Sequence, residues 1–249
     1  METGHADNLF GLLGKNISYS FSQGYFTEKF NHLGLKGHKY INFDIDTIEK
    51  LPDIIRENPN LKGMNVTIPY KEKVIPYLTA LNKKAKRIGA VNTIKITPEG
   101  LKGYNTDCYG FKKSLQPFLK AHHKKALILG TGGASKAIAY VLDELGIDYY
   151  YVSRKATGNK LSYDDLNKKI MDKFQIIINC TPLGTFPNIQ EKPDLPYKYI
   201  TQNHLLYDLI YNPEETTFLK LGREKGAQIC NGLKMLQLQA EKAWNIWNK

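Results

Sequence analysis

The feature that most constrains the fold is a glycine-rich turn between a short apolar run and an amphipathic helix. Residues 124–130 form an apolar segment typical of a buried parallel strand, and apolar residues after Gly133 recur at helical spacing until Gly146. A second apolar segment over residues 147–152 completes a strand–helix–strand unit. Because such a unit requires a parallel sheet covered by helices, the chain is predicted to be an α/β protein.

The turn itself has the chemistry of a cradle for a dinucleotide phosphate. Gly130 permits a sharp bend, and Gly132 and Gly133 let backbone N–H groups approach a pyrophosphate at the positive end of the helix. Ser135 stands where the usual G-x-G-x-x-G pattern has its third glycine, and an ordinary strand-to-helix turn shares these features. The complete strand, turn, helix and strand context favours dinucleotide binding.

The end of the second strand of this unit indicates which dinucleotide binds. An acidic residue is expected there when the ribose 2′-hydroxyl is bound, whereas the sequence reads Ser153, Arg154 and Lys155. A hydroxyl followed by two cations suits a 2′-phosphate, so NADP is predicted over NAD. The alternative is that the two cations are simply solvated at the surface.

Composition excludes several classes of protein. At 249 residues with 42% hydrophobic content, the chain can bury the core of one large domain or of two modest domains. No apolar run is long enough to span a bilayer and the N-terminus lacks the order of a signal peptide, so a cytoplasmic protein without membrane association is expected. Cys108, Cys180 and Cys230 are widely spaced, which predicts buried free thiols and neither disulfides nor a metal site.

The net charge of +11 raises the question of nucleic-acid binding. The lysines are scattered in short clusters, and no recognition-helix, RNA-binding or zinc-finger pattern accompanies them. A basic surface that attracts anionic metabolites explains the charge equally well. The expected partner is therefore a small molecule and not a nucleic acid.

Strand and helix patterns alternate on both sides of the central unit. Strands are expected over residues 9–14, 40–43, 63–68, 90–96, 101–104, 176–180, 205–211 and 228–230, and helices over 22–33, 48–57, 71–81, 213–225 and 233–247. Pro76 is expected to kink or split the third of these helices.

This alternation predicts two domains. Residues 1–105 and 231–249 are expected to form a substrate domain with a mostly parallel sheet, and residues 106–230 a Rossmann-like cofactor domain. The last helix is expected to return to the first domain with one apolar stripe, formed by Leu233, Leu236, Ala240, Trp244 and Trp247.

Three polar clusters interrupt the apolar pattern of the first domain, as expected at functional sites. The first holds Ser20 and Ser22 at the start of a helix, where a hydroxyl such as that of Ser22 often caps the helix. Alternate serines beside free helix N–H groups equally suit a bound carboxylate.

The other two clusters are expected near the carboxyl edge of the sheet, where ligands bind in parallel α/β folds. Asn65 and Thr67 point to one side of a strand, and Lys71 begins the next helix. Asn92 and Asp107 are expected at strand ends in the same small domain, where Asp107 can pair with Lys71.

These motifs, in their shared order, resemble the shikimate dehydrogenase family over nearly the full length of the chain. They comprise the serine pair, N-V-T-I-P-Y-K at 65–71, G-A-V-N-T at 89–93, G-x-N-T-D-x-x-G-F at 103–111, G-T-G-G-A-S-K-A at 130–137, N-x-T-P-L-G at 179–184 and G-x-x-M-L-x-x-Q-A at 232–240. The resemblance implies a monomer or homodimer that reversibly reduces 3-dehydroshikimate to shikimate with NADPH, in the route to chorismate and the aromatic amino acids.

The resemblance also implies a role for each matching residue. Lys71 and Asp107 are implied to be catalytic, with the proton donor left open between Lys71 and other groups. Substrate binding is implied for Ser20, Ser22, Asn65, Thr67, Asn92, Tyr211 and Gln239. Cofactor binding is implied for Gly130, Thr131, Gly132, Gly133, Ala134, Ser153, Arg154, Lys155, Thr181 and Gly232.

The sequence departs from the family pattern in places, and two alternatives stay open. Tyr19 and Gln23 replace a histidine and a proline beside the serines, while the cofactor signature keeps its central Arg154. One alternative is a quinate or quinate/shikimate dehydrogenase that tolerates NAD. The other is an inactive relative that senses a metabolite, against which the presence of Lys71 and Asp107 argues.

Overall fold

The computed structural model describes residues 7–18, 20–155, 158 and 160–249. Two compact units divide the chain, one formed by the part up to Thr106 with Ala240–Lys249 and the other by Asp107–Gln239. Thr106 therefore belongs to the first unit, whereas the sequence placed it in the cofactor domain. Residues 231–239 belong to the second unit, whereas the sequence placed them in the substrate domain. The final helix is continuous across the second boundary, so no change of sequence pattern marks it.

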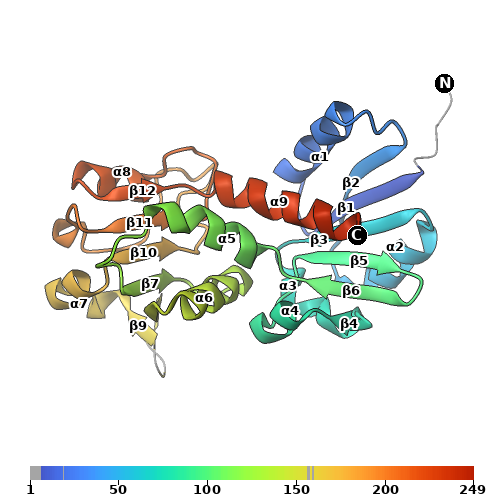
Figure 1. The fold of residues 1–249 in the computed structure, drawn as a ribbon. Coiled ribbons are helices and arrows are strands. Elements are labelled where there is room, and N and C mark those ends of the chain that lie inside the picture. The colour runs from blue at the N-terminus through green and yellow to red at the C-terminus, as the bar shows by residue number, and fades with distance from the viewer. Residues whose placement is uncertain (1–6, 19, 156–157, 159) are drawn as a thin grey trace. The chain divides into compact units, whose positions relative to one another are not determined.

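The first unit is built on a six-stranded sheet in the order β2-β1-β3-β5-β6-β4 (Figure 1). Strand β1 pairs in parallel with β2 and β3, β4 pairs in parallel with β6, and β5 pairs antiparallel with β3 and β6. The strands are β1 Asn8–Gly14, β2 His38–Asp44, β3 Leu61–Val66, β4 Ala80–Leu81, β5 Thr93–Thr97 and β6 Gly100–Tyr104, and the helices are α1 Phe21–His32, α2 Leu51–Glu57, α3 Tyr70–Lys73 and α4 Lys83–Ile88.

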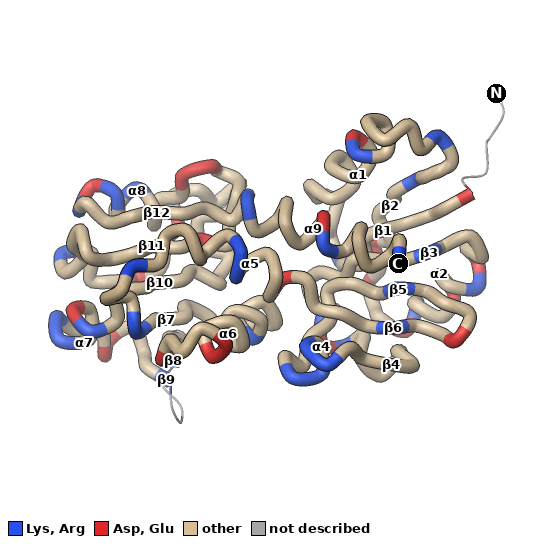
Figure 2. The backbone as a smooth tube through the Cα atoms, in the orientation of Figure 1, with Lys and Arg blue, Asp and Glu red and all other residues tan. Residues whose placement is uncertain are grey.

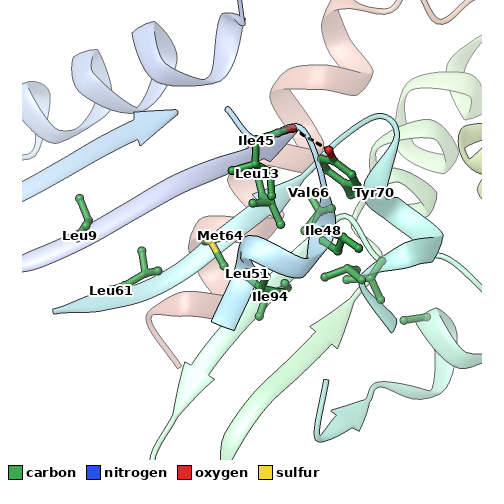
Figure 3. Packing of buried hydrophobic residues seen from close by; sticks show 13 residues of the cluster. Leu9, Leu13, Ile45, Ile48, Leu51, Leu61, Met64, Val66, Tyr70 and Ile94 are labelled. Atoms are coloured by element: carbon green, nitrogen blue, oxygen red, sulfur yellow. Dashed lines mark hydrogen bonds between the residues drawn. The ribbon is translucent and has the colours of Figure 1, made fainter. Parts of the chain in front are cut away.

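Alternate residues of β1 point into two cores on the two faces of this sheet, as period-two geometry requires. Phe10 packs in a cluster with α1, whereas Leu13 packs in a cluster with α2 and β3. In the second cluster, the buried Tyr70 donates its hydroxyl to the carbonyl oxygen of Ile45 at 2.7 Å (Figure 3). This bond anchors the short helix α3, which follows β3.

The C-terminal half of α9, Leu233–Trp247, packs on the Phe10 core, as the sequence predicted for the whole helix, whereas its part up to Gln239 belongs to the second unit. Ala240 and Trp247 of the predicted stripe are buried there, and the Trp247 Nε1–H donates to the carbonyl oxygen of Ile94 at 2.9 Å. A Cβ built on Gly63 would lie 2.3 Å from the Trp247 ring. The glycine at this position therefore lets the indole approach the sheet.

The second unit is a six-stranded sheet in the order β12-β11-β10-β7-β8-β9, with every adjacent pair parallel. The chain moves outward from β7 to β8 and then returns to the other side of β7 at β10, which creates the switch point of a Rossmann-like fold. The strands are β7 Lys125–Leu129, β8 Asp148–Ser153, β9 Lys160–Ser162, β10 Ile176–Asn179, β11 Leu205–Asp208 and β12 Gln228–Cys230, and the helices are α5 Asp107–Leu115, α6 Gly133–Leu145, α7 Lys168–Lys173 and α8 Thr217–Glu224.

Helices cover both faces of this second sheet. On one face, Met171 of α7 and Phe218 of α8 pack against Leu206 of β11. On the other, Phe111 of α5 stacks edge-on against Tyr207 of β11, with ring centroids 5.0 Å apart. The expected two-part α/β architecture with a Rossmann-like part is therefore confirmed.

Several expected elements differ from those observed. The helix expected over residues 71–81 ends at Lys73 and is followed by a 3-10 turn, Ile75–Tyr77, and then by strand β4. Pro76 within that turn explains the break, because proline removes a backbone donor. The short elements α4, α7 and β9 were absent from the predicted pattern, since each spans too few residues to show a period.

Two further corrections concern the second unit. The helix expected over residues 213–225 begins only at Thr217, because the Thr216 side chain caps it. The strand expected over residues 205–211 ends at Asp208, whose carboxylate accepts a backbone N–H two residues on.

The thiols differ in part from the prediction as well. Cys108 is buried, whereas Cys180 and Cys230 are partly exposed beside strand ends, and all three are free. Burial still raises the pKa of Cys230 to about 11, so it is protonated at neutral pH.

Charges are spread along both units, with acidic positions interspersed among the lysines and arginines (Figure 2). Among the described residues, no three or more histidine, cysteine or acidic side chains gather as metal ligands do. None of the described helices is long and apolar enough to cross a membrane.

Candidate active site

The serine pair lies in a turn that strand β2 holds in place. Ser20 is the N-cap of α1, and its Oγ accepts the backbone N–H of Ser22 at 3.2 Å. The Asp44 carboxylate accepts the N–H of Ile17 at 3.0 Å, and the Asn42 side chain donates to the Ile17 carbonyl oxygen at 3.2 Å. The capping role considered for Ser22 therefore belongs to Ser20, whose extended backbone suits an N-cap.

A line of buried polar side chains runs from this turn across the sheet. The Tyr40 hydroxyl faces Ser22 and donates to Asn65 Oδ1 at 2.9 Å. The Asn65 amide donates in turn to the carbonyl oxygen of Asn92 at 3.3 Å and to Thr93 Oγ1 at 3.2 Å. All five residues are less than one-tenth exposed, so each polar group depends on the next for its hydrogen bond.

The far end of this line fixes the Asn92 side chain. Its Oδ1 accepts the backbone N–H of Thr106 at 2.6 Å and the Thr93 hydroxyl at 3.2 Å, and its Nδ2 donates to Thr106 Oγ1 at 2.9 Å. These bonds leave the amide one orientation, which preorganises it.

Thr67 and Lys71 follow β3 directly. The Thr67 N–H donates to the carbonyl oxygen of Leu13 at 2.9 Å, which ties it to the end of β1. The Lys71 carbonyl oxygen accepts the N–H of Val91, the neighbour of Asn92, at 2.7 Å. The first unit thus brings together six of the predicted site residues at one edge of its sheet: Ser20, Ser22, Asn65, Thr67, Lys71 and Asn92.

The position of Asp107 differs from the one expected from the sequence. It opens α5 instead of ending a strand, and it belongs to the second unit and not to the domain of Lys71. A carboxylate in the first turn is favoured by the positive end of the helix. Its pairing with Lys71 stays a prediction.

Gln239 of α9 lies against the same helix. A Cβ built on Gly110, one turn after Asp107, would lie 3.1 Å from the Gln239 Cβ and 2.5 Å from the carbonyl oxygen of Met235. The close approach of α5 and α9 at this glycine therefore places Gln239 against α5, one turn from Asp107 along that helix.

The glycine turn has the geometry that its sequence predicted. Gly130 has φ +97°, which favours glycine, and a Cβ there would lie 3.1 Å from Thr181 Cγ2 at the end of β10. Gly132 is the N-cap of α6, and a Cβ there would meet nothing within 4 Å. Ser135 is fully buried and donates its hydroxyl to the Gly132 carbonyl oxygen at 2.7 Å, so the missing third glycine is accommodated inside the turn.

The residues at the end of β8 suit a phosphate. Ser153 donates its hydroxyl to the Lys155 carbonyl oxygen at 2.6 Å, which bends the chain, and Arg154 and Lys155 are exposed. Two solvated cations and no carboxylate within this tripeptide fit a 2′-phosphate. Together with Gly132, whose missing side chain leaves the helix N-terminus open, they fit a phosphorylated dinucleotide.

Tyr211 and Gly232 lie in neighbouring turns beyond β11 and β12. The Gly232 N–H donates to the carbonyl oxygen of Ile210 at 2.9 Å, and a Cβ on Gly232 would lie 2.1 Å from the Leu209 carbonyl oxygen. Only glycine fits there without moving the turn that precedes Tyr211.

Comparisons with known proteins bear on both units. A family model described as the shikimate dehydrogenase substrate binding domain matches residues 12–94. The shikimate dehydrogenase (NADP(+)) of Clostridium botulinum strain Hall is 40% identical over 249 residues, covering 95% of each chain. The chain belongs to the shikimate dehydrogenase family.

Solved structures of shikimate dehydrogenases share the fold. The crystal structure of shikimate dehydrogenase 1 from Peptoclostridium difficile is 42% identical with a TM-score of 0.85, covering 97% of this chain and 91% of that chain. The shikimate 5-dehydrogenase of Thermus thermophilus, in complex with NADP(H) and shikimate, is 29% identical with a TM-score of 0.84, covering 96% and 93%.

Sequence reasoning missed the side chains that hold the site residues in place. The sequence pattern identifies Tyr40 only as a strand residue, yet Tyr40, Asn42 and Asp44 all face the serine turn at period-two spacing. That spacing of polar side chains in a strand was the available signal. The family pattern contains histidine where this chain has Tyr19, which lies outside the described residues.

Proposed function

We propose that this chain catalyses the reversible, NADPH-dependent reduction of 3-dehydroshikimate to shikimate on the route to chorismate. The observation that carries the proposal is the buried hydrogen-bonded line from Ser22 to Asn92, which ends beside Lys71. This line orients several polar groups at one sheet edge, in a chain 40% identical to a shikimate dehydrogenase (NADP(+)). Polar groups so fixed suit a small ligand rich in hydroxyls.

The serine turn is proposed to bind the substrate carboxylate. Ser20 Oγ accepts the Ser22 N–H, and its O–H can at the same time donate to a carboxylate. The start of α1 adds the partial positive charge of a helix N-terminus. Thr67, Asn65 and Asn92 are proposed to position the ring hydroxyls.

Lys71 is proposed to act at the oxygen that changes between carbonyl and hydroxyl. As an ammonium group it donates a proton to that oxygen or stabilises the negative charge developing there. Asp107 and Gln239, which both belong to the second unit, are proposed to orient the substrate. Tyr211 is proposed to lie near both substrate and nicotinamide.

NADP is proposed as the cofactor, and when bound its nicotinamide supplies or accepts the hydride. The backbone of residues 130–134 is proposed to hold the pyrophosphate, with Thr181 and Gly232 lining the same edge of the sheet. Arg154, with Ser153 and Lys155, is proposed to hold the 2′-phosphate. This assignment rests on their exposure and charge at the end of β8.

Initial rates with shikimate or quinate, each paired with NADP or NAD, test the proposal. The expected result is reduced nicotinamide with shikimate and NADP, at a kcat/KM well above the other three pairs. A quinate rate equal to the shikimate rate would support the quinate/shikimate alternative. Silence with all four pairs, together with measurable shikimate binding, would support the metabolite sensor and contradict the proposal.

A further inference from the structure

A fully buried carboxylate lies at the carboxyl end of β11, outside the set of residues assigned so far. Asp208 is 0% exposed and accepts three hydrogen bonds. Its Oδ1 accepts from Asn179 Nδ2 at 3.1 Å and from the Ile210 N–H at 3.0 Å, and its Oδ2 accepts from Thr216 Oγ1 at 2.7 Å. Each donor comes from a different segment, so Asp208 joins three parts of the second unit.

The first of these bonds leads to the turn after β10. Asn179 uses its Oδ1 to accept both the N–H of Thr181 at 3.0 Å and the Thr181 hydroxyl at 2.6 Å. Thr181 in turn lies beside Gly130 of the glycine turn. Asp208 therefore fixes the Asn179 amide, and the amide fixes Thr181.

The second bond leads to the turn after β11. Asp208 holds the N–H of Ile210, and the Ile210 carbonyl oxygen accepts the N–H of Gly232. Tyr211 follows Ile210 directly. The same carboxylate oxygen thus sets the backbone on both sides of the site, at Thr181 and before Tyr211.

The sheet order places these two turns in one half of the cofactor site. A Rossmann-like sheet binds one mononucleotide over each half, and Arg154 at the end of β8 marks the adenosine half. Strands β10, β11 and β12 lie on the other side of β7. The turns held by Asp208 therefore belong to the nicotinamide half.

Burial of this carboxylate opposes its ionisation. Desolvation raises the pKa of Asp208 to about 6, although the bonds from Thr216, Ile210 and Asn179 lower it. The Thr216 hydroxyl already caps α8 by accepting the Leu219 N–H at 3.3 Å, and capping needs no buried charge. The buried Asp208 carboxylate is unfavourable to desolvate and is not needed for the cap, so we infer that its function is to hold the two turns.

We propose that Asp208 is a positioning residue for the nicotinamide half of the cofactor site, acting through Asn179 and Ile210 on the turns that carry Thr181 and Tyr211. The proposal rests on NADP being the cofactor. It requires the oxygen facing Asn179 and Ile210, and it does not require the second oxygen that faces Thr216.

Two ligands separate this role from general stability. NADPH occupies both halves of the site, whereas adenosine 2′,5′-bisphosphate occupies the adenosine half only. We expect Asp208→Ala to weaken NADPH binding about tenfold, as loss of a buried hydrogen-bonded anchor does, and to leave adenosine 2′,5′-bisphosphate affinity within about twofold. Fluorescence titration of NADPH and competition by the bisphosphate measure both.

Conservative variants test which oxygen matters. Asp208→Asn keeps an amide oxygen for Asn179 and Ile210 and turns its NH2 toward Thr216, so NADPH affinity should return to within about twofold of the parent. Thr216→Val should lower Tm and leave NADPH affinity unchanged. Tyr207→Phe is the matched control, because Tyr207 is buried on the opposite face of β11 and bonds Ser114 at 2.6 Å.

Asn179→Ala carries the same test if Asp208→Ala fails to fold, since it removes the side chain that joins Asp208 to Thr181. Tenfold weaker NADPH binding with unchanged bisphosphate affinity would support the proposal. Equal weakening of both ligands, an Asp208→Asn variant as weak as Asp208→Ala, or a Thr216→Val variant with the same NADPH loss would overturn it. A parent chain that binds no NADPH would instead overturn the proposed cofactor, and the parent titration shows this separately.

Discussion

Replacing Tyr40 by phenylalanine isolates one link of the buried line that supports the proposed substrate site. The ring stays, and with it the stacking on Phe26 at a centroid distance of 4.6 Å. Only the hydroxyl that donates to Asn65 Oδ1 at 2.9 Å is lost. Burial raises the pKa of Tyr40 far above its ordinary value, so this hydroxyl is a donor throughout the pH range of an assay.

The expected loss of stability follows from the Asn65 Oδ1 acceptor that loses its hydrogen bond. Asn65 is 5% exposed, so water cannot replace the lost donor at its Oδ1. An unsatisfied buried acceptor costs about 1–3 kcal/mol of unfolding free energy, and each kcal/mol lowers Tm by about 2–4 °C in a chain of this size. Asn65 also becomes free to rotate, so KM for shikimate should rise about three- to tenfold, as one weakened hydrogen bond implies.

Thermal unfolding and steady-state kinetics together check this reasoning. KM for NADP should stay unchanged, because Tyr40 lies in the first unit and the glycine turn lies in the second. Tyr150→Phe is the control, since Tyr150 is 44% exposed and lies in the second unit. A Tyr40→Phe chain with the Tm and shikimate KM of the parent would refute the account of the buried line.

Three other outcomes follow from the site. Lys71→Ala should lower kcat by about 10²- to 10⁴-fold with little change in shikimate affinity. The control Lys73→Ala changes an exposed neighbour in α3 and should leave kcat near the parent value. Retained turnover in Lys71→Ala would remove Lys71 from the mechanism. Arg154→Ala should raise KM for NADP about tenfold and hardly change KM for NAD, and equal losses would argue against a 2′-phosphate contact. Burial raises the folded pKa of Asp208 to about 6, so its protonated form stabilises the fold below the ordinary carboxyl pKa. The free energy of unfolding should fall by roughly 3 kcal/mol as pH rises from about 4 to 6. Urea unfolding at a series of pH values should show this fall in the parent and not in Asp208→Asn.

The sequence was sufficient where a local pattern and a local structure coincide. The glycine turn at Gly130, the helix that Gly146 ends and the α9 helix lie where their periodicity placed them. Each depends on contacts between residues close in the chain, which spacing and capping describe well.

The sequence was insufficient where a residue's role depends on distant partners. Asp208 was expected inside a longer strand, yet its carboxylate accepts the Ile210 N–H where the strand ends and also bonds the distant Asn179 and the nearby Thr216. Asp107 looked like a strand end, yet the start of a helix holds it. A periodic signal shows which side chains share one face of a strand, but the partners of that face on distant strands emerge only with the fold.

This chain is proposed to transfer hydride between NADPH and 3-dehydroshikimate, and the stoichiometry of the two products measures that transfer. The parent chain is mixed with 3-dehydroshikimate and NADPH, the loss of reduced nicotinamide is followed by absorbance, and shikimate is quantified by chromatography, with Lys71→Ala in parallel. One shikimate should form for each NADPH consumed, and the variant should react far more slowly. Binding of both compounds without NADPH consumption by the parent chain would contradict it.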